Sequence, residues 1–283
     1  IIKMSLFNVY PLYQMTPSHA KMCYVYEKNG TKYLDLYGGH AVISIGHSHP
    51  TYVKALTNQL NNIGFYSNYI INELQQSVAN EIKIQSKCNN YNLFMTNSGA
   101  ESNENALQVA SFYTKKSRII AFKNSFHGRS NAALSITDNH NIKSKLNEEI
   151  NVTFLNFNDK KNFKKEISKG DVCSVIFESI QGVGGLDEPE TEFVKYISKQ
   201  CKKYNTCLIA DEVQSGFGRT GYFFAFQKHD IEPDIICIAK GMGNGFPVGG
   251  ILIKDHIKSN YGMLGTTFGG NHLACTAVLA VLN

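Results

Sequence analysis

Several features that would restrict the function of this chain are missing from its 283 residues. Charged residues make up only 18% and hydrophobic residues 43%, a balance that excludes an intrinsically disordered chain. No apolar run approaches the roughly 20 residues that a membrane-spanning helix needs. The first ten residues lack the apolar centre and the cleavage site of a signal peptide. The composition instead predicts one large globular domain, or two modest ones, with a sizeable core.

Basic and metal-binding patterns are also sparse. The net charge is +5 and no run of five or more Lys or Arg occurs, so we interpret the basic pairs as solvated helix faces rather than as a nucleic-acid surface. The small excess still favours anionic small molecules. The seven cysteines form no Cys-x-x-Cys pair, and Cys173, Cys207 and Cys237 lie in apolar runs. They predict reduced, buried thiols, a cytoplasmic protein and no metal site.

Short apolar runs and amphipathic helices alternate along most of the chain. An Asn29-Gly30 turn between two β-rich runs predicts a hairpin over Cys23–Leu36. Seven later runs predict strands at 92–95, 118–122, 152–155, 173–177, 207–210, 235–238 and 250–253. Helices are expected at 52–60, 73–86, 101–113, 159–168 and 191–204. This alternation predicts an α/β fold with a mostly parallel central sheet and helices on both faces.

One soft boundary interrupts this pattern, near Gly38–Gly46. We therefore expect an N-terminal segment over residues 1–45 and a large domain over residues 46–283. The chain starts Ile-Ile-Lys before Met4 and stops inside the apolar stretch Ala274–Leu282, which has the pattern of an unfinished helix. We expect it to be part of a longer protein.

Ligands of such sheets bind outside the carboxyl ends of the strands, so the residues after each predicted strand matter most. After the strand at 92–95, Ser98, Gly99 and Ala100 open a helix where small residues let backbone N–H groups approach a phosphate. A plain Ser N-cap explains the same residues. This loop has neither a Walker lysine nor a Gly-x-Gly-x-x-Gly pattern, which argues against a nucleoside triphosphate or a dinucleotide.

The next two loops carry aromatic, basic and acidic side chains. Phe126 can stack on a flat ligand, and Arg129, two residues after His127, can hold a carboxylate through two hydrogen bonds. Glu178 ends a strand just before a glycine-rich loop, where it would face the cleft. An ordinary surface loop and a solvated acid are the alternatives for these two places.

Two charged residues follow the most apolar strands. Asp211 ends one of them, and a partly desolvated carboxylate there needs a cationic partner, such as a protonated ring nitrogen. Lys240 follows another, where desolvation would lower the pKa of the amine and make it nucleophilic towards an aldehyde. Thr266 and Thr267 add hydroxyls that can bind a phosphate or a carboxylate. A simple strand-end acid, a lysine that extends to water and a plain turn are the alternatives.

Taken together, these signals describe one ligand. A phosphate cradle, a stacking aromatic, an acid for a ring nitrogen and an amine for an aldehyde share one edge of the predicted sheet. These are the requirements of pyridoxal 5′-phosphate (PLP).

From about Leu6 to Leu282, the chain resembles the class III PLP-dependent aminotransferases of fold type I, specifically the acetylornithine aminotransferases. The most specific stretches, in the family's order, are Asn97–Glu101, Phe126–Arg129, Asp211–Gly221, Lys240–Gly250 and Thr266–Asn271, together with the similar stretch Tyr37–Pro50. The resemblance implies that residues 1–45 are part of a small domain, whose C-terminal part is missing after Asn283. It implies that residues 46–283 form the large PLP-binding domain.

The resemblance also implies a role for each matching position. Lys240 would hold the cofactor covalently and move a proton, and Asp211 would pair with the ring nitrogen. Arg129, with Thr266 beside it, would bind the substrate's α-carboxylate, while Glu178 would switch between the two substrates. The other cofactor contacts would be Ser98, Gly99 and Ala100 at the phosphate, Phe126 and Val213 on the two ring faces, His127, Gln214 at the phenolic oxygen, and Thr267 at the phosphate of the partner subunit's cofactor.

The implied reaction moves the δ-amino group of N2-acetylornithine to 2-oxoglutarate, which yields N-acetylglutamate 5-semialdehyde and glutamate in arginine biosynthesis. The implied assembly is a cytoplasmic homodimer with active sites at its interface and no nucleic-acid or membrane partner. Close alternatives are aminotransferases for N-succinylornithine, ornithine or 4-aminobutyrate. More remote ones are a PLP-dependent mutase or racemase and a non-catalytic homologue.

Three positions depart from the family pattern. Ser179 and His272 stand where a proline is usual, and Val183 stands where a glutamate is usual. None of them is an expected cofactor contact. The departures therefore bear on the Glu178 loop and its selectivity for the acyl substrate.

Overall fold

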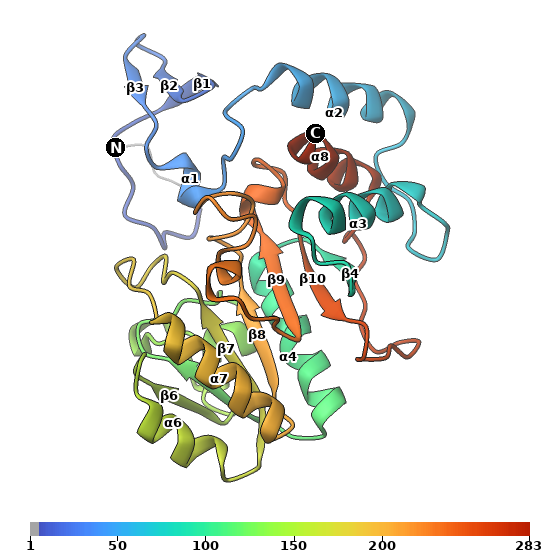
Figure 1. Cartoon of the computed structure of the whole chain (residues 1–283). Helices are drawn as coiled ribbons and strands as arrows, with labels where there is room; N and C mark the ends of the chain where they lie inside the picture. The colour runs from blue at the N-terminus through green and yellow to red at the C-terminus, as the bar shows by residue number, and fades with distance from the viewer. Residues whose placement is uncertain (1–5) are drawn as a thin grey trace.

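The computed structural model describes residues 6–283, so the first five residues of the predicted N-terminal segment lie outside the described residues. Within this range a three-stranded sheet lies near the N-terminus and a seven-stranded sheet forms the body of the molecule (Figure 1). The small antiparallel sheet contains β1 (Pro17–Lys21), β2 (Tyr24–Glu27) and β3 (Lys32–Leu34). Its β2–β3 hairpin confirms the expected turn, and Gly30 adopts the positive φ of 88° that this turn needs. Strand β1 was not among the elements expected from the sequence.

The large sheet has the strand order β4-β10-β9-β8-β7-β5-β6. Its strands are β4 (Tyr91–Thr96), β5 (Arg118–Phe122), β6 (Val152–Leu155), β7 (Val172–Glu178), β8 (Cys207–Asp211), β9 (Ile235–Ala239) and β10 (Gly249–Lys254). The helices are α1 (Gly38–Ala41), α2 (Pro50–Asn62), α3 (Glu73–Ser86), α4 (Gly99–Thr114), α5 (Asn131–Ser135), α6 (Lys160–Ile167), α7 (Thr191–Lys203) and α8 (His272–Leu282). Every predicted strand and helix is present, with ends that differ by at most two residues.

Four of the six strand pairs in this sheet are parallel, which confirms the expected mostly parallel sheet. Strand β10 is the exception, because it runs antiparallel to both of its neighbours. As a result its first residue, Gly249, pairs with Thr96 at the end of β4 and with Ala239 at the end of β9. The start of β10 therefore reaches the same edge of the sheet at which the parallel strands end.

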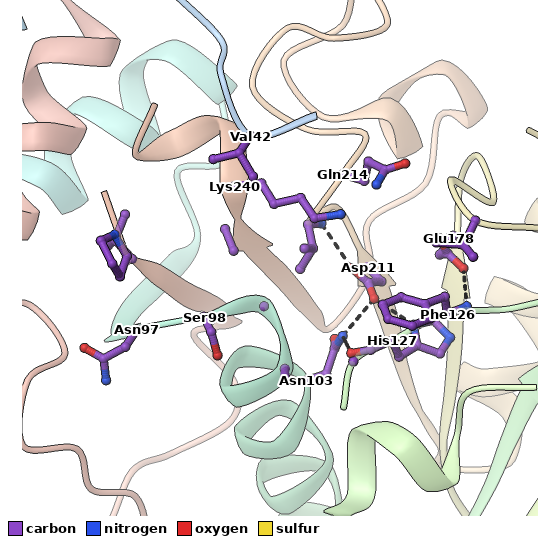
Figure 2. Close-up of a pocket in the computed structure, with 18 of the residues that line it drawn as sticks. Val42, Asn97, Ser98, Asn103, Phe126, His127, Glu178, Asp211, Gln214 and Lys240 are labelled. Atoms are coloured by element: carbon purple, nitrogen blue, oxygen red, sulfur yellow. Dashed lines mark hydrogen bonds and ion pairs between the residues drawn. The ribbon is translucent and has the colours of Figure 1, made fainter. Parts of the chain in front are cut away.

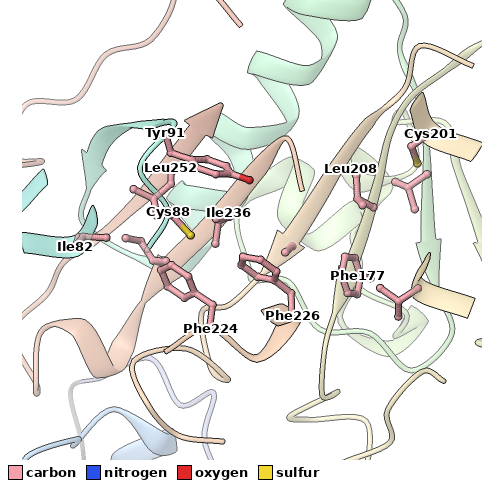
Figure 3. Packing of buried hydrophobic residues seen from close by; sticks show 14 of the residues in the cluster. Ile82, Cys88, Tyr91, Phe177, Cys201, Leu208, Phe224, Phe226, Ile236 and Leu252 are labelled. Carbon is pink, nitrogen blue, oxygen red and sulfur yellow. The ribbon is translucent and has the colours of Figure 1, made fainter. Parts of the chain in front are cut away.

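The two faces of the sheet form separate cores. Alternate side chains of a strand point to opposite faces, so Ile119 and Ala121 pack on the α4 side, while Ile120 and Phe122 belong to the core on the other side. Helices α3 and α7 cover that second face, where Ile82, Cys201 and the strand residues Phe177, Leu208, Ile236 and Leu252 meet (Figure 3). Burial of each such side chain contributes about 1.5–3 kcal/mol. The expectation of helices on both faces is confirmed.

Helix α8 is the last element of the chain. It packs against both α2 and α3, which precede β4 in the sequence (Figure 1). Its apolar sequence is consistent with burial of Ala274, Cys275, Ala277 and Val278. No helix within residues 6–283 combines the length and apolarity that a bilayer crossing requires.

Candidate active site

Glu178, Asp211 and Lys240 come together because they belong to three adjacent parallel strands. Glu178 is the last residue of β7 and pairs with Asp211, the last residue of β8, while Lys240 directly follows β9. They line one cavity of ≈ 330 Å³, which we call the lysine cavity (Figure 2). Ten of the residues chosen from the sequence line it: Ser98, Gly99, Ala100, Phe126, His127, Glu178, Asp211, Val213, Gln214 and Lys240.

Asp211 is held by three N–H donors. Its Oδ2 accepts hydrogen bonds from His127 Nδ1 at 2.6 Å and from Asn103 Nδ2 at 2.8 Å, and its Oδ1 accepts one from the backbone N–H of Val213 at 3.0 Å. The side chain is 4% exposed. Each carboxylate oxygen has two acceptor positions, so Oδ1 keeps one for a further donor in the cavity. The arrangement fixes the direction of the carboxylate and leaves it able to bind one N–H cation.

His127 lies behind Asp211 and is buried with it. Burial disfavours the charged imidazole, but the hydrogen bond to Asp211 and the negative charges of Asp211 and Glu178 outweigh burial and raise the pKa of His127 above 6.5. His127 therefore stays protonated, and paired with the carboxylate of Asp211, up to a higher pH than an imidazole in water does. His127 thus acts on the site through Asp211, and it also lines the lysine cavity.

Lys240 stands at the start of a 3-10 helix, Lys240–Met242, with a backbone φ of 50°. Non-glycine residues rarely adopt this left-handed conformation, and they do so where the surrounding structure imposes it. Burial lowers the pKa of its amine below 10.5, and the positive charge of Arg219 acts in the same direction, while Asp211 and Glu178 oppose the shift. A larger share of the amine is therefore neutral, and the neutral amine is the form that attacks an aldehyde.

The N-terminus of α4 forms another wall of the lysine cavity. Ser98 caps the helix by accepting the N–H of Glu101 at 3.2 Å, so the ordinary capping role is present. Gly99 is also tightly packed, because a Cβ there would lie 2.6 Å from Cγ1 of Val213. The helix can thus approach the cavity wall closely and present its free N–H groups and the positive end of its dipole to an anion.

Glu178 is bonded to the loops around the cavity. Its Oε1 accepts the backbone N–H of Phe126 at 2.9 Å and its Oε2 accepts that of Gly182 at 3.2 Å. Burial raises the pKa of Glu178 to about 7, and the charge of Asp211 adds to the effect. Rotation of this carboxylate would break both bonds, so the geometry favours a role in holding the Phe126 loop. The expected role of Glu178 in switching between the two substrates stays a prediction. Val183 lines the same cavity and is 63% exposed.

These residues fit the PLP that the sequence predicts. A helix N-terminus faces the cavity for a phosphate, Phe126 and Val213 line it for a flat ring, and Asp211 retains an acceptor position for a ring N–H. Lys240 supplies the amine for the aldehyde. No cluster of three or more His, Cys, Asp or Glu side chains within residues 6–283 has the arrangement of a metal site.

Three residues chosen from the sequence lie elsewhere. Arg129 is exposed and does not line the lysine cavity. Thr266 and Thr267 line a second cavity of ≈ 850 Å³, which we call the threonine cavity. The Oγ1 of Thr266 accepts hydrogen bonds from Asn97 Nδ2 and from the backbone N–H of Gly269, each at 3.1 Å. Asn97 lines both cavities and connects them.

Three residues of this site were not identified from the sequence. Asn103, which binds Asp211, shares a face of α4 with Ala106 and Ala110, and a polar residue on an otherwise apolar helical face was a signal. Val42 lines the lysine cavity, and Asn244 holds the segment that carries it. No local pattern indicates these two, because their partners are about 200 residues away in the sequence.

Comparison with known proteins places these residues in a family context. A family model described as "Aminotransferase class-III" matches residues 8–283. An acetylornithine aminotransferase of Bacillus subtilis (strain 168) is 40% identical over 281 residues, which cover 98% of this chain and 72% of that protein. The acetylornithine aminotransferase of Halalkalibacterium halodurans is 39% identical with the same coverage.

Solved structures show the same fold. The ornithine aminotransferase of Toxoplasma gondii matches 98% of this chain with a TM-score of 0.89 and 25% identity, and 68% of that protein is covered. That structure shows partial occupancy of PLP at its active site.

Proposed function

The chain belongs to the class-III aminotransferases, which are PLP-dependent enzymes, and on this premise we propose that it transfers the δ-amino group of N2-acetylornithine to 2-oxoglutarate. The products are N-acetylglutamate 5-semialdehyde and glutamate, and the proposed pathway is arginine biosynthesis. The observation that carries the proposal is the convergence of Lys240, Asp211 and the N-terminus of α4 around one cavity. The choice of amine rests on the identity of 39–40% to two acetylornithine aminotransferases.

The chain's own residues supply binding, orientation and proton transfer. Bound PLP supplies an electrophilic aldehyde and a ring that withdraws electrons. Lys240, whose pKa is lowered, would supply the neutral amine that holds the cofactor's aldehyde carbon, with loss of water. Once the substrate amine has displaced it, Nζ of Lys240 would accept the proton of the substrate carbon that bears the migrating amine and deliver it to the former aldehyde carbon of the cofactor. Asp211 would hold the ring N–H and so keep the ring electron-poor, and Asn103 and His127 fix the direction of Asp211.

The far end of the substrate is proposed to bind outside the lysine cavity. N2-acetylornithine carries its α-carboxylate several bonds away from the reacting δ-amine, so a cation near the cavity mouth is the expected partner. Arg129 is exposed on the loop that follows Phe126 and His127, both of which line the cavity. We propose that Arg129 holds this carboxylate and that Glu178 contributes through the Phe126 loop. A contribution from Thr266, which lines the threonine cavity, stays a prediction.

A comparison of amine donors tests the proposal. Initial rates with 2-oxoglutarate are measured for N2-acetylornithine, N2-succinylornithine, ornithine and 4-aminobutyrate, and kcat/KM is compared. We expect both N-acylated ornithines to exceed free ornithine by about tenfold or more, since an unacylated α-ammonium adds a charge that must be desolvated. A preference for free ornithine or for 4-aminobutyrate would contradict the acyl assignment. Glutamate formation that requires 2-oxoglutarate separates amino transfer from mutase or racemase chemistry.

We also propose that two copies assemble and that Thr267 serves the cofactor of the partner subunit. The threonine cavity supports this, because apolar side chains around it are open to solvent: Tyr69 is 99% and Phe268 is 60% exposed. Exposed aromatic patches of this kind mark protein interfaces. Seven unpaired cysteines, six of them buried, support the proposed cytoplasmic location.

Sedimentation velocity tests the assembly. We expect a dimer for the wild-type chain, and a shift towards monomer in Phe268→Asp, which places a charge in the proposed interface. Leu146→Asp is the matched control, since Leu146 is 76% exposed and lies in a different part of the chain. An unchanged dimer in Phe268→Asp, or a monomeric wild type, would contradict this interface.

A further inference from the structure

A short segment of the N-terminal region lies against the loop that carries Lys240. We call this segment, Val42–Gly46, the strap. Figure 2 shows Val42 beside Lys240, and Val42 lines the lysine cavity. The strap leads from α1 to α2, about 200 residues before Lys240 in the sequence. Its position therefore depends on contacts with the Lys240 loop rather than on local structure.

One side chain makes most of these contacts. Oδ1 of Asn244 accepts the backbone N–H groups of Ser44 at 2.9 Å and Ile45 at 3.1 Å, and its Nδ2 donates to the carbonyl of Gly46 at 3.0 Å. Asn244 is 6% exposed. The side-chain amide is thus paired to three backbone groups of the strap. A fourth bond, from Ser44 Oγ to the carbonyl of Gly241 at 2.7 Å, joins the same two segments.

Asn244 also shares its loop with the catalytic amine. It follows Lys240 by four residues and has a backbone φ of 46°, a left-handed conformation that asparagine tolerates better than most residues. The side chain of Asn244 therefore sets the position of the strap relative to Lys240. Buried amide hydrogen bonds of this kind are costly to leave unpaired, so the strap has one favoured position.

We propose that Asn244 is a positioning residue that clasps the strap to the Lys240 loop and thereby fixes Val42 as a wall for the aliphatic chain of the amine substrate. The inference rests on the proposed function for the identity of that substrate. The three hydrogen bonds that hold Asp211 come from Asn103, His127 and Val213, and none of these residues belongs to the strap. Release of the strap should therefore impair binding of the amine substrate and leave attachment of PLP to Lys240 intact.

Two substitutions of Asn244 separate the side chain from the backbone conformation. Asn244→Gly removes all three bonds and keeps the left-handed backbone free of strain. Asn244→Asp keeps the acceptor for Ser44 and Ile45 but replaces the donor to Gly46. Hydrogen–deuterium exchange of the peptide that contains Ser44 and Ile45 is measured on the whole protein with PLP added. We expect about tenfold faster exchange in Asn244→Gly and a smaller increase in Asn244→Asp.

Steady-state kinetics are measured on the same variants. We expect KM for N2-acetylornithine to rise about three- to tenfold in Asn244→Gly, with a smaller change in kcat and the same amount of PLP bound per chain. Tyr52→Phe is the matched control, because the Tyr52 hydroxyl donates to the carbonyl of Gly243 at 2.7 Å and ties α2, not the strap, to the same loop. This control should leave exchange of the strap unchanged.

Unchanged exchange in Asn244→Gly would overturn the clasp, and faster exchange with an unchanged KM would overturn its positioning role. Equal acceleration of the strap in Tyr52→Phe would also overturn it, since the effect would then reflect general loosening of the loop. If the wild-type chain transfers no amine, the proposed function fails, while the exchange measurement still decides whether Asn244 holds the strap.

Discussion

The lysine cavity and the threonine cavity differ in how completely this chain builds them. In the lysine cavity, Asp211 is 4% exposed and bonded to three N–H donors, and both oxygens of Glu178 have backbone partners. Around the threonine cavity, Tyr69 is 99% exposed, and Thr267 and Phe268 are also open to solvent. The groups proposed for cofactor chemistry are thus held in place by one chain. The groups proposed for a partner lie on its surface.

The difference shows which side chains a single chain holds in a fixed position by itself. Preorganised charges act strongly because they are buried and already oriented before the ligand arrives. Exposed side chains gain a fixed position only when a substrate or a second copy covers them. Substitutions in the lysine cavity should therefore alter the chemical step, whereas those at the exposed positions should alter binding.

Asp211→Asn should have the largest effect. The substitution preserves the shape of the side chain but removes the negative charge that is proposed to hold the ring N–H, and it leaves His127 beside a neutral amide. We expect kcat to fall by about 10²–10³-fold, while KM changes little. Steady-state kinetics at saturating 2-oxoglutarate provide the measurement. A fall in kcat of less than about tenfold would place the essential charge elsewhere.

Arg129→Ala should have a smaller effect of another kind. Loss of an exposed guanidinium that is proposed to bind the substrate carboxylate should raise KM for N2-acetylornithine by about tenfold and leave bound PLP unchanged. Arg129→Lys keeps the charge but not the paired hydrogen bonds, so an intermediate KM is expected. If KM is unaffected in both variants, the carboxylate binds at another residue.

Glu212→Gln should alter stability more than activity. Glu212 is fully buried on the side of β8 away from Asp211 and accepts hydrogen bonds from Ser179, Ser215 and the backbone N–H groups of Ala225 and Phe226. Burial raises its pKa to about 7 from 4.5. The neutral acid is favoured in the folded state, so its contribution is complete below about pH 4.5 and is lost as the pH rises through about 7.

The measurement is the free energy of unfolding from urea titrations between pH 4.5 and 8. Glu212 should contribute a decline of up to roughly 3 kcal/mol over this range, and Glu212→Gln should lose that part of the slope. Glu178, with a pKa also raised to about 7, should still contribute to the decline in both proteins. Equal slopes for wild type and Glu212→Gln would show that Glu212 is not protonated in the folded state.

Much of the fold was predictable because its signals are local. The apolar strands ended in charged residues, and the parallel order of β7, β8 and β9 then placed Glu178, Asp211 and Lys240 at one edge. The reversed direction of β10 was not predictable, since an apolar strand has the same pattern in either direction. The clasp by Asn244 and the strand β1 were missed for a similar reason: both depend on pairing with other segments rather than on local sequence pattern.

One departure from the family pattern, Ser179, also depends on a contact between residues that are distant in the sequence. Ser179 donates to Glu212 at 3.2 Å, so this substitution has a partner in the structure. That partner is 33 residues away in the sequence, and the predicted strand ends did not indicate it. Roles at exposed positions such as Arg129 and Thr267 stay predictions for this reason.

The most direct test asks whether Lys240 is the residue that bonds to PLP. Wild type and Lys240→Ala are mixed with PLP, reduced with borohydride, digested and examined by mass spectrometry, and their visible absorption spectra are recorded before reduction. The account predicts a yellow absorption band and a phosphopyridoxyl group on Lys240 in the wild type, and neither in Lys240→Ala. Attachment to another lysine, or an equal band in Lys240→Ala, would contradict it.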